Sequence, residues 1–132
     1  MAKPESSRYM KSHEWAAEEG GSITVGVSEH AQKEISDVVF VELPKVGRKV
    51  KQGEAVAVIE SVKAAFDIYS PVTGEIAAVN DAVVKDPALV NREPHAGGWL
   101  FKVKGQAAEL QALMDWKAYQ DFVKSAAGSS GH

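Results

Sequence analysis

A chain of 132 residues that is 45% hydrophobic can bury the core of one domain, and it has no apolar run near the ~20 residues of a membrane-spanning helix. It contains no cysteine, which excludes disulfides, thiolate nucleophiles and cysteine-ligated metals. The net charge is −3 with acidic and basic residues interspersed, so there is no basic surface for a phosphate backbone. We therefore expect neither nucleic acid nor a membrane as a partner, and we expect a monomer. The start of the chain resembles neither a signal peptide nor a transit peptide, which predicts a cytoplasmic protein.

The two ends of the chain hold too few apolar residues to pack. This predicts flexible tails at residues 1–8 and 125–132, with a single domain at residues 9–124 between them. The first strong signal in the domain is "SITVGV", whose alternating apolar residues predict a strand. "SEHAQKEIS" then predicts a short helix, and the β-rich run "DVVFVELP" predicts a strand that ends at Pro44.

The stretch "VIESVKAAFDIYSPVTGE" predicts a hairpin. Val56 and Val58 alternate before Lys63, and Phe66 and Ile68 alternate after it, as in two paired strands. "SPVTG" supplies the proline and glycine of the next turn. Lys63 should therefore be exposed at the hairpin tip, where an ordinary solvated lysine that discourages edge pairing is the simplest interpretation.

The C-terminal stretch "AELQALMDWKAYQDFVK" places apolar residues at helical spacing. They are Leu110, Leu113, Met114, Tyr119, Phe122 and Val123. The pattern predicts a packing stripe on two short helices that meet near Asp115. Together the segments predict a mostly β protein with a few helices.

Chemical motifs outside the hairpin are few. His30 and Glu34 stand four residues apart on the predicted helix, a spacing that can hold a metal, but we interpret them as a polar helix face and predict no metal site. We interpret Trp99 as a residue whose side chain packs in the core. The chain has no G-x-S-x-G, H-E-x-x-H or P-loop motif, so we predict no catalytic residues.

Several stretches together resemble one family. They are "SHEW", "VFVELPKVG", "ESVKAAFDIYSPVTGEI", "ALVNREP" and "GGWLFKV". Over roughly residues 9–124 the chain is similar to the glycine cleavage system H proteins, which are lipoyl carriers. The resemblance implies a barrel-sandwich hybrid of two antiparallel sheets, with a short helix in the N-terminal half and helices near the C-terminus.

The resemblance also implies a covalent site. Lipoate would be attached in amide linkage to Lys63, within the motif Glu60-Ser61-Val62-Lys63-Ala64. Family members fold the loaded arm into a surface cleft, and Glu14 of "SHEW" occupies the matching cleft position. Its carboxylate could bind the cationic amine of the arm.

The implied partners are four enzymes. A pyridoxal-phosphate glycine decarboxylase loads an aminomethyl group onto the lipoyl disulfide, and a tetrahydrofolate-dependent aminomethyltransferase removes its carbon. The FAD-containing dihydrolipoyl dehydrogenase reoxidises the remaining dithiol, and a lipoate-attaching enzyme modifies the lysine. The chain would thus be a shuttle and not an enzyme.

Two other carrier roles are alternatives to the glycine cleavage shuttle. Some family members act mainly as relays that pass lipoyl groups to other 2-oxoacid dehydrogenase complexes, and the lysine motif does not separate that role from glycine cleavage. Biotin carriers have the same architecture but usually set their lysine between two methionines, where this chain has Val62 and Ala64. Biotin is therefore disfavoured.

The chain departs from the family pattern at three positions. Phe66 stands where a small polar residue is usual, Ser36 replaces a common glycine, and His95 stands where tyrosine is typical. None of them lies in the lysine motif, so they bear on the cleft and not on the carrier assignment.

Overall fold

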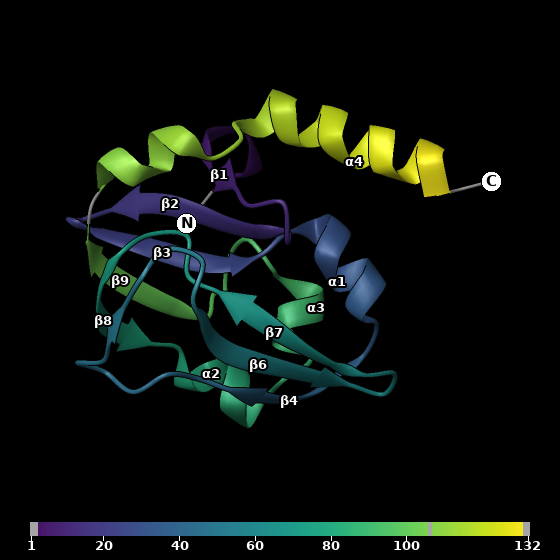
Figure 1. Cartoon of the computed structure of the whole chain (residues 1–132). Coiled ribbons are helices and arrows are strands. Elements are labelled where there is room, and N and C mark those ends of the chain that lie inside the picture. Colours follow the sequence, from purple (N-terminus) through teal and green to yellow (C-terminus); the bar gives the residue numbers. More distant parts are fainter. Residues whose placement is uncertain (1–2, 106, 131–132) are drawn as a thin grey trace.

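In the computed structural model, which describes residues 3–105 and 107–130, two antiparallel sheets pack on a common apolar core (Figure 1). The larger sheet has the strand order β1-β2-β3-β9-β8-β5, and the smaller one has the order β4-β6-β7. The strands are β1 (Arg8–Tyr9), β2 (Glu14–Glu19), β3 (Ser22–Val27), β4 (Val38–Glu42), β5 (Lys49–Val50), β6 (Ala55–Ser61), β7 (Ala65–Tyr69), β8 (Gly74–Val79) and β9 (Phe101–Gly105). The predicted mostly β fold of two antiparallel sheets is confirmed.

Short helices connect and cover the sheets. They are the 3-10 helices η1 (Pro4–Ser6) and η2 (Ala107–Ala112) and the α-helices α1 (Glu29–Ile35), α2 (Asp81–Lys85), α3 (Leu89–Arg92) and α4 (Trp116–Ser130). Helix α1 is the one predicted from "SEHAQKEIS", and it begins after Ser28, whose hydroxyl accepts a hydrogen bond from Ala31 N at 3.1 Å. Within the described ranges, every helix is too short or too polar to cross a membrane.

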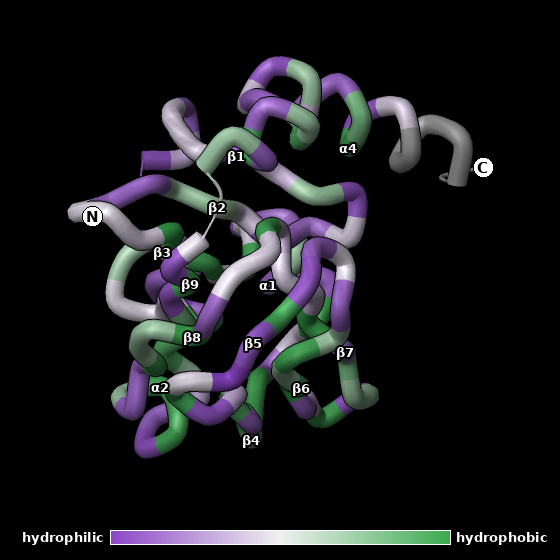
Figure 2. The backbone as a smooth tube through the Cα atoms, turned by 60° about the vertical axis from the view of Figure 1, so that its left-hand side comes forward, coloured by the Kyte–Doolittle hydropathy of each residue, from purple (hydrophilic) through white to green (hydrophobic). Residues whose placement is uncertain are grey.

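The core lies between the two sheets. Ile23, Val25 and Val27 of β3 are each at most 2% exposed, and they join one apolar cluster with Ile59 of β6 and Ile68 of β7. Figure 2 shows hydrophobic (green) and hydrophilic (purple) residues mixed along the tube, and the alternation is clearest in the sequence of β9, "FKVKG". The strand predicted from "SITVGV" is therefore confirmed, with its apolar face turned to the core.

The predicted hairpin forms from β6 and β7, and its first strand contains an irregularity. The register shifts between Ala55 and Ala57, as at a β-bulge. Beyond the bulge, Ala57 and Ile59 are buried, whereas Val58 is only half-buried. The two strands pair as predicted, and the bulge changes the phase of β6, so the neighbouring residues Val56 and Ala57 are both buried.

A second apolar cluster joins the ends of the chain. Tyr9, Trp15, Ala17 and Tyr119 form its buried part, and the rings of Tyr9 and Tyr119 stack with centroids 4.2 Å apart. Helix α4 lies across the outer face of the large sheet (Figure 1). The C-terminal stripe thus forms one 3-10 helix and one α-helix with Asp115 between them, as predicted.

The segments predicted as tails have regular structure where they are described. Pro4–Ser6 form η1, Ser7 is 2% exposed, and the Tyr9 hydroxyl donates to Pro4 O at 2.8 Å. Helix α4 continues beyond the predicted boundary at residue 124. Residues 1–2 and 131–132 of the predicted tails lie outside the described residues. The flexibility of the two ends stays a prediction.

Candidate functional site

Lys63 lies in the tight turn that joins β6 to β7. The Ser61 hydroxyl oxygen accepts hydrogen bonds from Lys63 N at 3.1 Å and Ala64 N at 3.2 Å, and Ser61 N donates to Ala64 O at 2.9 Å. Val62 is 69% exposed, and Lys63, Ala64 and Ala65 are exposed as well. Ser61 thus fixes the backbone of the turn while the side chains around the lysine stay open to solvent.

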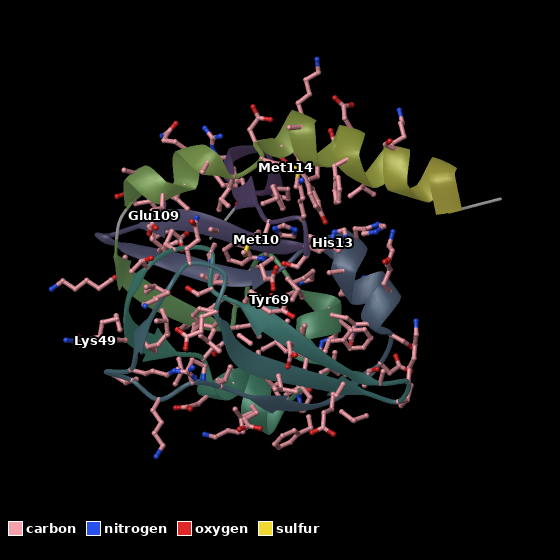
Figure 3. The ribbon with its side chains drawn as sticks, in the orientation of Figure 1. Met10, His13, Lys49, Tyr69, Glu109 and Met114 are labelled. Atoms are coloured by element: carbon pink, nitrogen blue, oxygen red, sulfur yellow. The ribbon has the colours of Figure 1, made fainter. Side chains whose placement is uncertain are left out.

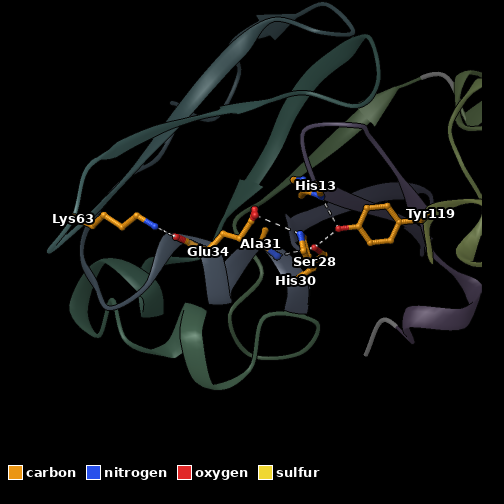
Figure 4. Close-up of polar contacts among 7 residues, drawn as sticks. All are labelled: His13, Ser28, His30, Ala31, Glu34, Lys63 and Tyr119. Carbon is orange, nitrogen blue, oxygen red and sulfur yellow. Dashed lines mark hydrogen bonds and ion pairs between the residues drawn. The ribbon is translucent and has the colours of Figure 1, made fainter. Parts of the chain in front are cut away.

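The Lys63 side chain leans against the end of helix α1. Its Nζ donates to Glu34 O at 2.8 Å (Figure 4), and Val62 N donates to Asp37 O at 3.1 Å. The carbonyl of Glu34 lies in the last turn of α1, where backbone oxygens lack helical partners and attract positive charge. The hairpin tip is therefore held by one hydrogen bond to the last turn of α1, made by the amine itself, and by one to Asp37 just after the helix.

Glu14 begins β2 and is buried, with 1% of its surface exposed. The Ser12 hydroxyl donates to its Oε1, and Tyr69 N donates to its Oε2 at 2.7 Å. Burial raises the pKa of the Glu14 carboxyl, and the two donated hydrogen bonds oppose this effect. Both carboxylate oxygens thus have a partner, and the partner of Oε1, Ser12, is an exposed residue.

Lys63 and Glu14 lie at opposite ends of β7. Glu14 bonds to Tyr69, the last residue of β7, whereas Lys63 precedes the first residue, Ala65. The four residue steps between Ala65 and Tyr69 correspond to about 13 Å along the strand. Within the predicted site, the structure therefore keeps the attachment motif together and sets Glu14 apart from it.

The structure also contains a polar network that the sequence did not predict, and it includes His13, the residue before Glu14. His13 Nδ1 is 2.8 Å from Tyr119 Oη, which is 2.6 Å from Ser28 Oγ (Figure 4). Burial raises the pKa of Tyr119 to about 12, and burial and the neighbouring His30 lower the pKa of His13. At neutral pH Tyr119 therefore keeps its proton and His13 is uncharged. No local pattern could predict a contact between residues 106 positions apart.

Comparison with known proteins identifies the family. A family model described as "Glycine cleavage H-protein" matches residues 7–126. A glycine cleavage system H protein of Escherichia coli O139:H28 is 53% identical over 123 residues, which cover 92% of this chain and 95% of that protein. One from Salmonella newport is 55% identical over 119 residues, covering 89% and 92%.

A solved structure agrees with these sequence matches. A crystal structure of a glycine cleavage system H protein from Mycobacterium marinum has a TM-score of 0.81 and 33% identity, and covers 98% of this chain and 100% of that one. The chain belongs to the glycine cleavage H-protein family. This family carries lipoyl and is not one of catalytic enzymes, so the predicted family and class of protein are confirmed.

The three departures from the H-protein pattern have structural counterparts. Ser36 has a φ of 72°, a left-handed conformation that glycine adopts without steric cost. Phe66 is half-buried opposite Ile59 and packs on the core. His95 stacks on the Trp15 ring at 5.6 Å, and His95 Nε2 accepts a hydrogen bond from Glu29 N at 3.3 Å. Both large side chains are thus used in packing.

Trp99 lies at the edge of the second apolar cluster. It is partly buried there, and Lys102 Nζ lies 5.2 Å from its ring centroid. The interpretation of Trp99 as packing is consistent with this position, although its ring is not part of the fully buried core.

Proposed function

We propose that Lys63 carries a lipoyl group in amide linkage and that the chain is the shuttle of a glycine cleavage system. In that role it takes an aminomethyl group from the pyridoxal-phosphate glycine decarboxylase to the tetrahydrofolate-dependent aminomethyltransferase. It then passes electrons to the FAD-containing dihydrolipoyl dehydrogenase. The observation that carries the proposal is one exposed lysine, held at the tip of a fixed hairpin in a chain whose family carries lipoyl.

The surroundings of Lys63 fit an acyl group on its amine. Ala64 and Ala65 are small and exposed, so an attaching enzyme can approach the side chain. Nζ makes one hydrogen bond, to the backbone oxygen of Glu34. An amide nitrogen keeps one N–H after acylation, and it can still donate to that oxygen.

Amide formation needs the neutral amine, which sets a condition on the attaching enzyme. A protonated amine has no free electron pair with which to attack an acyl donor. Within the described residues, Lys63 Nζ has one hydrogen-bond partner, the backbone oxygen of Glu34, and a carbonyl oxygen is too weak a base to take up the proton. The attaching enzyme must therefore remove the proton and bind the exposed turn while it does so.

After attachment, the role of the chain is to present and then shelter the arm. When bound, the lipoyl group supplies a disulfide that accepts the aminomethyl group and, afterwards, a dithiol that can be reoxidised. Ser61 holds the turn in one conformation, so partner enzymes meet the lysine in a fixed position. The hydrogen bond to Glu34 favours a side chain that lies toward α1.

For Glu14 we propose the docking of the amine of the loaded arm. The carboxylate is already placed at the distal end of β7, and the exposed Ser12 hydroxyl is the group that covers its Oε1. An amine that displaces the hydroxyl would gain a charge-assisted hydrogen bond to a desolvated carboxylate. The arm would then lie along β7 with its reactive end away from bulk water.

The attachment proposal is tested by intact mass and peptide mapping of the chain after incubation with lipoate, ATP and a lipoate ligase. We expect one lipoyl increment per chain, on the peptide that contains Lys63, and none without ligase. An increment on another lysine, or a biotin increment after growth in a host that makes both cofactors, would overturn the proposal.

The relay role uses the same lipoyl-lysine, so the mass does not separate it from glycine cleavage. Glycine-dependent exchange of labelled carbon dioxide with glycine decarboxylase does. A lipoylated chain that supports no exchange, but donates lipoyl to a 2-oxoacid dehydrogenase acceptor domain, would make the relay its function.

A further inference from the structure

Three donor side chains meet beside helix α1. One ring nitrogen each of His13 and His30 and one carboxylate oxygen of Glu34 lie within 4.8 Å of one another. His30 and Glu34 project from successive turns of α1, and His13 comes from the loop before β2, which lies beside α1 in Figure 3. The side chains of His30 and Glu34 are 34% and 54% exposed, so the cluster is open to solvent.

The spacing of these donors suits a small transition-metal ion. Two donors at 2.0–2.2 Å from a tetrahedral Zn²⁺ lie about 3.3 Å apart. His30 Nε2 and Glu34 Oε2 are 3.4 Å apart already, and the His13 and His30 ring centroids are 4.9 Å apart. Small rotations of the exposed Glu34 and half-buried His30 side chains would bring all three donors into the same geometry.

His13 is held in an orientation that favours metal binding. Its Nδ1 is 2.8 Å from Tyr119 Oη, and Tyr119 is itself anchored by Ser28. When Nδ1–H donates to that oxygen, the lone pair of the imidazole is on Nε2, as in metal-ligating histidines whose other nitrogen has a fixed partner. His13 also has a φ of 78°, an uncommon backbone conformation for a residue other than glycine.

We propose that His13, His30 and Glu34 form a site for a divalent transition-metal ion such as Zn²⁺, with a fourth position left for water. His13 Nε2, His30 Nε2 and a Glu34 oxygen are the donors, and Tyr119 is a positioning residue. Two imidazoles and a carboxylate suit zinc better than magnesium or calcium, which prefer oxygen donors. The sequence favoured no metal because it presents only His30 and Glu34 at a metal-binding spacing, and His13 joins them only in the fold.

The site would tie separate parts of the fold together. A bound ion would link the loop before β2 to α1, and through Tyr119 to α4. Because Lys63 Nζ bonds to the backbone of Glu34, the same ion would steady the helix end that supports the hairpin tip.

The test is a calorimetric titration of the full-length, unlipoylated chain with ZnCl₂. The chain is left unmodified because a dithiol would itself bind zinc, which also makes the result independent of the lipoyl proposal. We expect saturable binding of one Zn²⁺ per chain. Absence of saturable binding would overturn the proposal.

Ligand variants locate the ion. His30→Gln and Glu34→Gln change exposed side chains and should each weaken binding by at least about tenfold, the loss seen even for outer-shell partners. Glu29→Gln is the matched control, because it removes the same charge from the same helix outside the cluster, and it should leave affinity within about twofold. Equal affinity of wild type, His30→Gln and Glu34→Gln would also overturn the proposal.

The role of Tyr119 has its own readout. In ¹⁵N NMR, Zn²⁺ should shift His13 Nε2 while Nδ1 stays protonated, and Tyr119→Phe should reduce affinity about tenfold and mix the two tautomers of the metal-free ring. Zinc that shifts other histidines but not His13 would contradict the assignment.

Discussion

At the scale of single residues, Glu14 is the side chain with the most unusual surroundings. It is buried, and its carboxylate accepts hydrogen bonds from one side chain and one backbone amide. Burial raises its folded pKa above the ordinary value of 4.5. The raised pKa therefore contributes to the free energy of unfolding. This contribution is fully present below about pH 4.5 and is lost as the pH rises through the folded pKa.

The substitution Glu14→Gln tests two effects of the carboxylate separately: the stability lost by burying its charge, and its proposed binding of the amine of the arm. Glutamine keeps an acceptor for Tyr69 N but cannot ionise. The stability of wild type relative to the variant should therefore decrease as the pH rises from about 4 to 7. The loaded variant should release its aminomethyl group about tenfold faster, because a neutral acceptor binds a cationic amine more weakly than a carboxylate.

Two measurements check the Glu14 prediction. Urea unfolding across that pH range gives the stability difference, and the decay of loaded protein on storage gives the release rate, with equal lipoylation as the control. Equal decay of mutant and wild type would remove Glu14 from the docking role and leave it as a structural carboxylate.

At the scale of elements, the β6–β7 hairpin depends on Ser61. Its hydroxyl oxygen accepts the two amides of the turn, which would otherwise depend on water. Ser61→Ala should lower the free energy of unfolding by about 0.5–1.5 kcal/mol, the usual value of such hydrogen bonds at a partly exposed place. It should also slow lipoylation, because the ligase would meet a turn of many conformations.

Amide hydrogen exchange measures the Ser61 prediction directly. Exchange at Lys63 N and Ala64 N should accelerate in Ser61→Ala, while amides in the β2–β3 pair stay unchanged. Ser22→Ala, at the first residue of β3, is a matched control that should alter neither the turn nor the lipoylation rate. Normal lipoylation of Ser61→Ala despite faster exchange would show that the ligase does not need a preformed turn.

Elements were predictable where the signal was local. The alternation in "SITVGV" predicted β3 and the apolar spacing of the C-terminus predicted α4, because each depends on residues a few positions apart. The bulge after Ala55 was not predictable, because an extra residue changes the phase of a strand and no particular residue type marks its position.

At the scale of the whole molecule, the sequence could not predict which distant surfaces meet. Glu14 bonds to Tyr69 across 55 positions, and His13 contacts Tyr119 across 106. These pairs form because two sheets and a C-terminal helix pack together, and no short window of sequence contains both partners. The family resemblance supplied the lysine and Glu14, whereas the histidine cluster became visible only in three dimensions.

The fold as a whole should tolerate the loss of the amine that the proposed function requires. Lys63→Arg keeps the positive charge at an exposed turn and can still donate to Glu34 O, so its free energy of unfolding should change by less than about 0.5 kcal/mol. A guanidinium stays protonated and offers no neutral amine to an acyl donor. Glycine-dependent carbon dioxide exchange should therefore vanish.

The comparison pairs thermal melts with the exchange assay after incubation with lipoate, ATP and ligase. Lys51→Arg is the matched control, because it makes the same change at another exposed turn and should retain full exchange. We expect Lys63→Arg to melt like wild type and to show no exchange, while Lys51→Arg keeps it. This result would mean that function needs the amine of Lys63 and that the stability of the fold does not. Exchange by Lys63→Arg at the rate of the lipoylated wild type would instead reduce Lys63 to a surface charge, and the carrier chemistry would have to reside elsewhere in the chain.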